Sequence, residues 1–110
     1  MSINNDLVLV YVTTPNMKEA KSIAKKIIDL KLAACCNIYE NITSIYRWEG
    51  EVQEDNECSI FLKTKKDLFE ELKENIIKMH SYDNPCVVML PILEGSELFM
   101  KWVNNEVKSR

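Results

Sequence analysis

The segment Ile42-Thr43-Ser44-Ile45-Tyr46-Arg47-Trp48 alternates two sets of side chains, which is the period of a β-strand. The side chains that share one face of this strand are Ile42, Ser44, Tyr46 and Trp48. Glu49-Gly50-Glu51 follows directly and predicts a hairpin turn. We therefore expect a β-hairpin whose first arm covers about residues 42–48.

The arm that returns from this turn covers about residues 52–63 and alternates in the same way. One of its faces is uniformly apolar and consists of Cys58, Ile60 and Leu62. The opposite face mixes charged groups with an aromatic ring and consists of Glu57, Ser59, Phe61 and Lys63. We expect the apolar face to lie on the core.

The segments on either side of the hairpin predict two amphipathic helices. Asn16 with Glu19 three residues later resembles a capping box, and apolar residues at helical spacing continue the first helix to about Leu32. Thr64, with an aspartate three residues later, marks the start of the second helix, which we expect to end near His80.

Two further apolar runs predict strands. Residues 7–13 precede the first helix and residues 86–90 follow the second, and both are apolar on both faces, as expected of strands inside a sheet. A short helix begins after Gly95-Ser96. The side chains expected to form its buried stripe are Leu98, Phe99, Trp102 and Val103.

The predicted order of strand, helix, strand, strand, helix, strand is that of the α+β ferredoxin-like fold, with one extra C-terminal helix. A chain of 110 residues suits one domain, so we expect a single domain over residues 1–110, ordered from about 7 to 108. The hairpin arms are longer than such a domain needs. Because unpaired strand invites aggregation, we predict that copies of the chain pair their excess strands in a homo-oligomer.

Composition argues against several partners. The formal charge of -3 and the pI of about 5.2 provide no attraction for nucleic-acid phosphates or anionic lipid. The apolar run at residues 7–12 is too short to span a bilayer, and no basic segment typical of a signal peptide precedes it. The four cysteines lack the spacing of a disulfide framework. We therefore predict a cytoplasmic protein with reduced thiols that binds neither nucleic acid nor membrane.

His80 is the only histidine and the first candidate ligand. It lies where the second helix should end, and the partial negative charge of a helix C-terminus favours an imidazolium there. We expect it to be exposed and to bind copper or another divalent cation, with the Met79 thioether as a weaker second ligand. The alternatives are that His80 only caps carbonyl groups and that Met79 only packs in the core.

A second candidate site is a polar and aromatic cleft between subunits that binds a small ligand. It would combine Trp48, Glu57, Lys63 and Tyr82, with Lys63 supplying charge to an anionic or zwitterionic ligand and Trp48 a stacking face. The alternative is that these residues only make contact between subunits, where Tyr and Trp are enriched, although a pocket at a subunit boundary would satisfy both interpretations. The residues expected at that interface are Tyr46, Trp48 and Trp102.

Catalysis has little support in the sequence. We find no serine nucleophile motif, no recognisable pairing of cysteine with histidine and no glycine-rich phosphate loop. One histidine would have to serve every proton-transfer role. We therefore predict that the protein is not an enzyme.

Six parts of the sequence share their order and spacing with a known family: Leu32-Ala33-Ala34-Cys35-Cys36-Asn37-Ile38, Ser44-Ile45-Tyr46-Arg47-Trp48-Glu49-Gly50, Glu57, Leu62-Lys63-Thr64, His80-Ser81-Tyr82-Asp83-Asn84-Pro85 and Trp102. They resemble the CutA divalent-cation-tolerance proteins. The resemblance implies a ferredoxin-like homotrimer, built like the PII signalling proteins, with hairpins paired between subunits and clefts between them. It also implies a role in tolerance to copper and other divalent cations; the alternative is a PII-like sensor of small molecules or a scaffold for protein interactions.

The resemblance assigns candidate residues to both sites. Bacterial members described as copper binders use a cysteine at the end of the first strand and two adjacent histidines at the end of the second helix. The corresponding positions here hold Val12, Met79 and His80, so one ligand of that set is retained. The cleft positions match better, at Trp48, Glu57, Lys63, His80 and Tyr82.

Overall fold

The computed structural model describes residues 6–109. In chain order, the elements are β1 (Leu7–Thr14), α1 (Met17–Asp29), β2 (Cys35–Trp48), β3 (Glu51–Lys65), a 3₁₀ turn (Lys66–Leu68), α2 (Phe69–Met79), β4 (Val87–Pro91) and α3 (Glu97–Glu106). Among these described elements, no helix combines the length and hydropathy needed to cross a bilayer.

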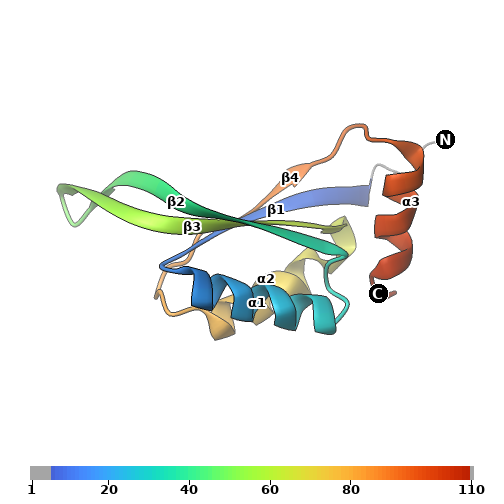
Figure 1. The fold of residues 1–110 in the computed structure, drawn as a ribbon, viewed down its shortest axis with the longest axis horizontal. Helices are drawn as coiled ribbons and strands as arrows, with labels where there is room; N and C mark the ends of the chain where they lie inside the picture. Colours follow the sequence, from blue (N-terminus) through green and yellow to red (C-terminus); the bar gives the residue numbers. More distant parts are fainter. Residues whose placement is uncertain (1–5, 110) are drawn as a thin grey trace.

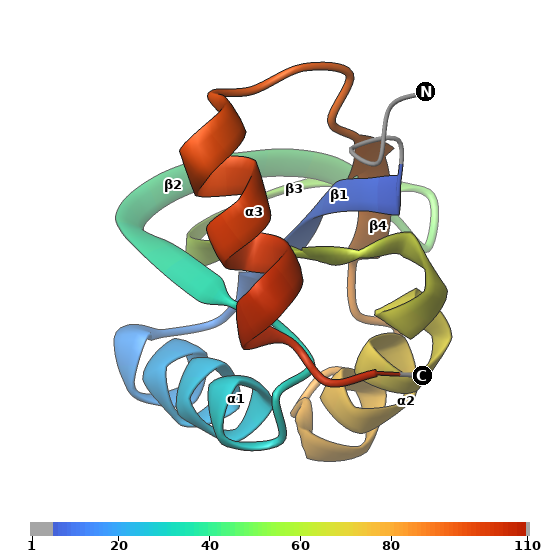
Figure 2. The ribbon, with the colours of Figure 1, turned by 90° about the vertical axis from the view of Figure 1, so that its right-hand side faces the viewer.

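The sheet is antiparallel and has the strand order β2-β3-β1-β4. Helices α1 and α2 lie next to each other against one face of the sheet (Figure 1). Helix α3 stands across the end of the sheet that is opposite to the hairpin turn (Figure 1 and Figure 2). This arrangement is the ferredoxin-like fold with an added C-terminal helix, and it confirms the predicted fold class.

The core lies between the sheet and helices α1 and α2. The β1 side chains that face the helices are Val8, Val10 and Val12, and all three are buried. The register pairs Val10 with Leu62 and Val12 with Ile60, so β3 faces the helices with Cys58, Ile60 and Leu62. The core face predicted for the returning arm is therefore confirmed.

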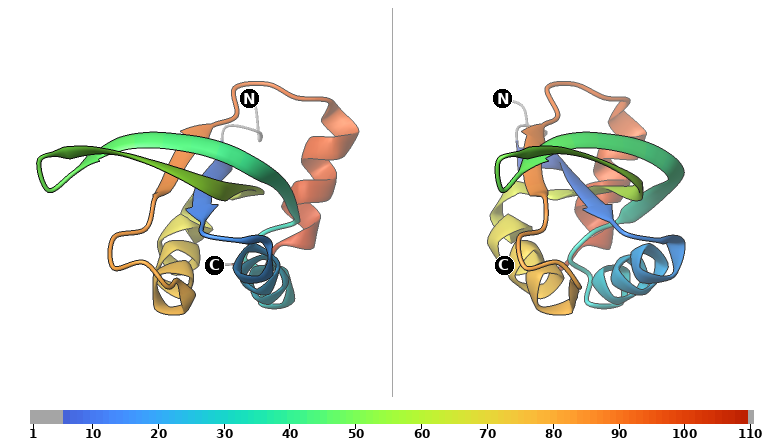
Figure 3. Two further views of the ribbon diagram at one scale, coloured as in Figure 1. Left: turned by 60° about the vertical axis from the view of Figure 1, so that its left-hand side comes forward. Right: turned by 90° about the vertical axis from the view of Figure 1, so that its left-hand side faces the viewer.

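The hairpin is longer than predicted, because β2 has 14 residues and β3 has 15. Its two arms form a twisted ribbon that extends beyond the helices (Figure 1 and Figure 3). A register shift between Tyr39 and Ile42 separates the part of β2 that lies on the sheet from the part that projects. Ile45 and Val52 on the projecting part are 67% and 64% exposed, so a single chain leaves apolar ribbon uncovered.

The turn at the tip of the hairpin has Glu49 at φ 50° and Gly50 at φ 83°. Two consecutive positive φ angles between paired strands are typical of a type I′ turn, whose favoured first residue is asparagine. We expect Glu49→Asn to raise the free energy of unfolding by about 0.5–1 kcal/mol, because asparagine tolerates left-handed backbone better than glutamate. Urea unfolding measures the change. Glu49→Ala keeps the strained backbone and is the control; a destabilised asparagine variant would contradict this assignment of the turn.

Two predicted helix boundaries are wrong. Helix α1 ends at Asp29 rather than near Leu32, because Lys31 has φ 59° and turns the chain out of the helix. Thr64 does not begin α2, because it is the last core-facing residue of β3. Its hydroxyl donates a hydrogen bond to the Leu32 carbonyl at 2.7 Å, and a 3₁₀ turn precedes α2 instead.

Strand β4 was predicted to be central, but it pairs only with β1 and forms an edge of the sheet. Its apolar composition is therefore not explained by burial within one chain. Val88 and Leu90 are 47% and 46% exposed, on the sheet face that α1 and α2 do not cover. These side chains are available to another molecule.

Fewer side chains of helix α3 are buried than predicted. Met100 and Val103 pack on Leu7 at the end of the sheet. Of the predicted stripe only Val103 is buried, and the exposed members are Leu98, Phe99 and Trp102. The reason is that α3 crosses the end of the sheet instead of lying along a face, so only one line of its side chains reaches the sheet (Figure 2).

Candidate functional site

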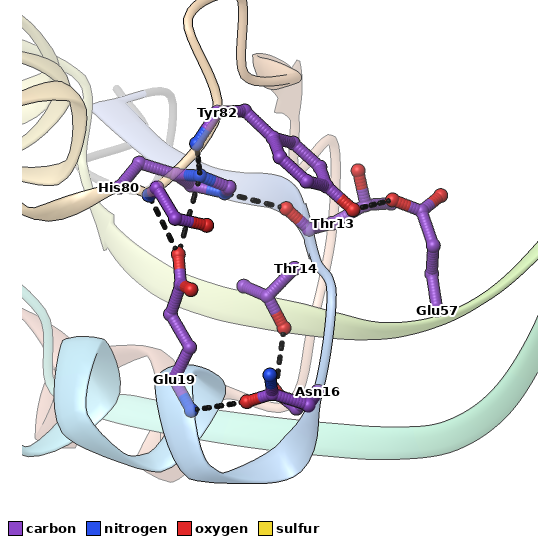
Figure 4. A network of polar contacts seen from close by, with 8 residues as sticks. Thr13, Thr14, Asn16, Glu19, Glu57, His80 and Tyr82 are labelled. Atoms are coloured by element: carbon purple, nitrogen blue, oxygen red, sulfur yellow. Dashed lines mark hydrogen bonds and ion pairs between the residues drawn. The ribbon is translucent and has the colours of Figure 1, made fainter.

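His80 is buried at the end of α2, and its side chain is 0% exposed. The prediction that the His80 imidazole is exposed is therefore wrong. The backbone of His80 is extended, which turns the chain away from the helix and carries the ring to the end of β1. There Nε2 lies 2.7 Å from the carbonyl oxygen of Thr13 (Figure 4).

Both ring nitrogens of His80 have partners. Nε2 donates to the Thr13 carbonyl oxygen, because that oxygen can only accept. Nδ1 accepts the backbone N–H of Tyr82 at 3.1 Å, and the Glu19 carboxylate lies 3.3 Å from the same nitrogen. His80 therefore caps a carbonyl group, as the alternative interpretation proposed, but that carbonyl belongs to β1 and not to α2.

Glu19, on α1, supports the segment of residues 80–82 that follows α2. Asn16 caps the helix, since its Oδ1 accepts the Glu19 N–H at 2.9 Å, which confirms half of the predicted capping box. The Glu19 side chain does not return to Asn16, because its Oε2 accepts the N–H of Ser81 at 2.9 Å. Sequence reasoning missed Glu19 as a site residue because the capping spacing accounted for it locally.

A groove of about 960 Å³ lies beside the end of α2 and follows the projecting hairpin from its base toward its tip. Glu57 is 8% exposed, and its Oε2 accepts the Tyr82 hydroxyl at 2.7 Å (Figure 4). On the neighbouring strand the Tyr46 hydroxyl donates to the Asp55 carboxylate. The walls also include Tyr11, Arg47, Trp48 and Asp83. The groove thus combines carboxylates held by phenols with further aromatic surface.

Three of the four predicted cleft residues line this groove: Trp48, Glu57 and Tyr82. Within one chain Lys63 does not line it, although it shares a strand face with Glu57, and its place in a cleft between subunits stays a prediction. Six residues along β3 correspond to about 20 Å. The Lys63 ammonium instead donates to Asn37 and lies 3.9 Å from the sulfur of Cys35.

The other predicted residues are placed as follows. Tyr46 and Trp48 are 42% and 50% exposed on the hairpin, and Trp102 is 44% exposed on α3, next to Phe99. Met79 is half-buried and packs against the core, as its alternative interpretation proposed. The interface role of the three aromatic residues and the metal role of Met79 and His80 stay predictions.

The remaining metal-ligating side chains are dispersed. Within residues 6–109, no three side chains of His, Cys, Asp or Glu gather in a group that could hold a metal ion. Val12, at the position of the family's first-strand cysteine, is fully buried. The four cysteines are free, and burial raises the pKa of the Cys36 thiol to about 12, so that Cys36 is a neutral thiol at pH 7.

Burial, followed by the hydrogen bond to Glu57, raises the pKa of Tyr82 above its ordinary value of 10.0. The folded state therefore favours the neutral phenol, which stabilises the fold below that ordinary value and ceases to do so as the pH rises through the folded-state pKa. We expect Glu57→Gln to lower the pKa of Tyr82, because an amide does not repel the phenolate. The carbon-13 Cζ signal of Tyr82 during alkaline titration measures this.

Glu54→Gln is the matched control for that titration, because Glu54 is exposed on the same strand and points to the opposite face. It should leave the Tyr82 midpoint unchanged. An unchanged midpoint in Glu57→Gln would show that the carboxylate and the phenol are not in contact.

The fold and the groove define a ferredoxin-like α+β domain with an elongated hairpin and a polar, aromatic groove along that hairpin. A model of the CutA1 divalent ion tolerance protein family matches residues 8–106. The chain therefore belongs to the CutA1 family, which confirms the resemblance seen in the sequence.

Individual relatives agree with this assignment. The chain is 43% identical over 102 residues to "Protein CutA, chloroplastic" of Arabidopsis thaliana, covering 93% of this chain and 56% of that protein. It is 43% identical over 95 residues to "Divalent-cation tolerance protein CutA" of Thermus thermophilus, covering 86% and 92% of the two chains. The crystal structure of CutA1 from Oryza sativa superposes with a TM-score of 0.94 at 40% identity, covering 99% and 100%.

Proposed function

We propose that this protein acts in divalent-cation tolerance by binding, without catalysis, and that its ligand occupies the groove beside Glu57. Relatives that share about two fifths of its residues are named divalent-cation tolerance proteins. The observation that supports the groove is Glu57, a carboxylate that is 8% exposed at the wall of a cavity of about 960 Å³. Burying a charged group is costly unless it is paired, so a position of this kind suits a ligand-binding residue.

The working unit in this proposal is a homotrimer in the cytoplasm. The sheet face that α1 and α2 leave open carries packed rings of Tyr11, Tyr39 and Phe61, with centroids 5.1 and 5.6 Å apart. Val88 and Leu90 extend this apolar face along β4. A surface of this kind is typical of a face that another copy covers. The four free cysteines are compatible with a reducing compartment.

Assembly has a direct test. We expect the wild-type chain to scatter light with three times the 12.8 kDa mass of one chain, and Val88→Glu to shift the mass toward that of one chain. The reason is that a carboxylate placed in a dry interface has no partner for its charge. Lys21→Glu, on the exposed face of α1, is the control and should keep the wild-type mass. A wild-type mass of one chain would contradict the trimer.

A second candidate is a site for copper or another divalent cation at His80, with Met79 as a further ligand. It is supported by the family's copper-binding positions and by the Glu19 carboxylate 3.3 Å from Nδ1, since imidazole and carboxylate both ligate such metals. A metal on His80 must displace either the Tyr82 N–H from Nδ1 or the Thr13 carbonyl from Nε2. The groove requires no such rearrangement, which is why we favour it.

Two variants separate these candidates. Melting temperatures are measured with Cu(II), Zn(II) and a panel of charged metabolites, for the wild type, Glu57→Gln and Met79→Leu. A ligand at one hundred times its dissociation constant stabilises the folded state by about 2.7 kcal/mol, which is readily detected. We expect Glu57→Gln to lose the stabilisation and Met79→Leu, which conserves core volume, to keep it. The opposite result would favour the metal site, and equal stabilisation of all three proteins would refute the groove.

A further inference from the structure

A continuous set of polar contacts joins helix α1 to the groove. Glu19 Oε2 accepts the Ser81 N–H at 2.9 Å and lies 3.3 Å from Nδ1 of His80. That nitrogen accepts the Tyr82 N–H at 3.1 Å, and the Tyr82 hydroxyl donates to Glu57 at 2.7 Å (Figure 4). The contacts therefore run from α1, through the segment after α2, to the groove wall on β3.

The segment between α2 and β4, residues 80–86, belongs to no helix or strand. A ladder of backbone hydrogen bonds therefore does not fix its path. Two consecutive backbone N–H groups of this segment are instead bonded to side chains: that of Ser81 to Glu19 and that of Tyr82 to His80. These side chains determine where the chain places the Tyr82 side chain.

The Tyr82 ring transmits this placement to the groove. It packs on the His80 ring, with centroids 4.8 Å apart, and the His80 ring is itself anchored to the Thr13 carbonyl of β1 at 2.7 Å. Burial, followed by the hydrogen bond to Glu57, raises the pKa of Tyr82, so the phenol is a neutral donor at pH 7. It occupies Oε2 of Glu57 and thereby restrains the rotation of that carboxylate in the groove.

The length of the Glu19 side chain suits this role. Glu19 lies in the first turn of α1, and its side chain is 18% exposed. A carboxylate that is mostly removed from water needs hydrogen-bond partners, and the Ser81 N–H is one of them. Aspartate would be shorter by one carbon–carbon bond, about 1.5 Å, which is enough to break a hydrogen bond of ordinary length.

We infer that Glu19 is a positioning residue for the groove: together with His80 it fixes residues 80–82, and through Tyr82 it orients the Glu57 carboxylate. This inference rests on the proposed binding role of Glu57 and adds a residue, on a different element, on which the geometry of that site depends. All of these contacts lie within one chain, so they do not require a second copy.

Nuclear magnetic resonance of the ligand-free protein tests the inference. The carbon-13 Cζ signal of Tyr82, assigned by its loss in Tyr82→Phe, reports the hydrogen bond of the phenol. The carboxyl carbon signal of Glu57, assigned by its loss in Glu57→Gln, reports the surroundings of the carboxylate. We expect Glu19→Ala to shift both signals toward their positions in the urea-unfolded chain, because residues 80–82 lose the acceptor that holds them.

Two further substitutions separate the reach of Glu19 from its charge. Glu19→Gln keeps the length and an oxygen for the Ser81 N–H, so both signals should return to their wild-type positions. Glu19→Asp keeps the charge in the first turn of α1 but not the reach, so both signals should shift as in Glu19→Ala. Glu74→Ala, at an exposed position of α2, removes a glutamate from a helix elsewhere and should leave both signals unchanged.

Wild-type positions of both signals in Glu19→Ala and Glu19→Asp would overturn the inference. So would equal shifts in Glu19→Gln and Glu19→Ala, because the charge and not the reach would then be responsible. If Glu19→Ala does not fold, the comparison of Glu19→Asp with Glu19→Gln decides the same question. No ligand is added, so a negative result removes the positioning role alone, and the melting experiment with Glu57→Gln decides the binding role of the groove separately.

Discussion

Replacing His80 with alanine is expected to lower the free energy of unfolding by about 2–4 kcal/mol. The imidazole is fully buried, and it holds the Thr13 carbonyl through Nε2 and the Tyr82 N–H through Nδ1. Its removal leaves two backbone groups without their partner, each worth about 1–3 kcal/mol, beside a ring-sized cavity. Urea unfolding followed by circular dichroism measures the difference.

Glu19→Gln is the matched control for this change. Glutamine retains an oxygen to accept the Ser81 N–H and alters only the charge beside Nδ1, so we expect less than about 1 kcal/mol of destabilisation. If His80→Ala unfolds at the same urea concentration as the wild type, the ring is not structural and an exposed metal-binding role regains support. A loss of metal binding in His80→Ala alone is ambiguous, because the variant also disturbs the fold; Met79→Leu avoids this problem.

The second large effect is expected at Ile76 on α2. Ile76 is fully buried in the core, whereas its neighbour Ile77 is 47% exposed. We expect Ile76→Ala to lower the free energy of unfolding by about 3–4 kcal/mol and Ile77→Ala by less than about 1 kcal/mol. The helix propensity change is the same in both variants, so their difference isolates the packing of α2 on the sheet.

The same urea experiment measures both isoleucine variants, and the unfolding slope shows whether either one changes the amount of surface exposed. Equal losses of unfolding free energy in Ile76→Ala and Ile77→Ala would contradict the orientation of α2 on the sheet. A larger loss at Ile77 than at Ile76 would place the opposite side of the helix against the core.

Local patterns predicted the regular elements well. The alternation at Cys58, Ile60 and Leu62 identified the core face of β3, because successive side chains of a strand point to opposite sides. The Glu49-Gly50 turn followed from a local conformational preference. Predictions at element boundaries were weaker. Thr64 has the chemistry of a helix cap, yet its hydroxyl bonds to Leu32, which is distant in sequence and near in space.

The candidate site was predicted in part. Trp48, Glu57 and Tyr82 were identified as cleft residues. Glu57 and Tyr82 meet because the loop after α2 returns to the base of the hairpin, and Trp48 lines the same groove nearer the hairpin's tip. Lys63 shares a strand face with Glu57 but lies six residues along the strand, outside the groove of one chain, so its place in a cleft between subunits stays a prediction. Asp55 and Glu19 were missed, because neither belongs to a motif that indicates binding.

The amino-acid pattern was sufficient for the order of the elements, the long hairpin, the core side of each central strand and membership of the CutA1 family, because all of these depend on local periodicity and motif spacing. Tertiary contacts alone determined that His80 is buried, that β4 lies at an edge and that Glu57 and Asp55 face an acidic, aromatic groove. The physical reason is that burial and charge pairing depend on segments far apart in the chain. The approach of Thr13, Glu19 and Tyr82 to one imidazole arises only when β1, α1 and the loop after α2 pack together.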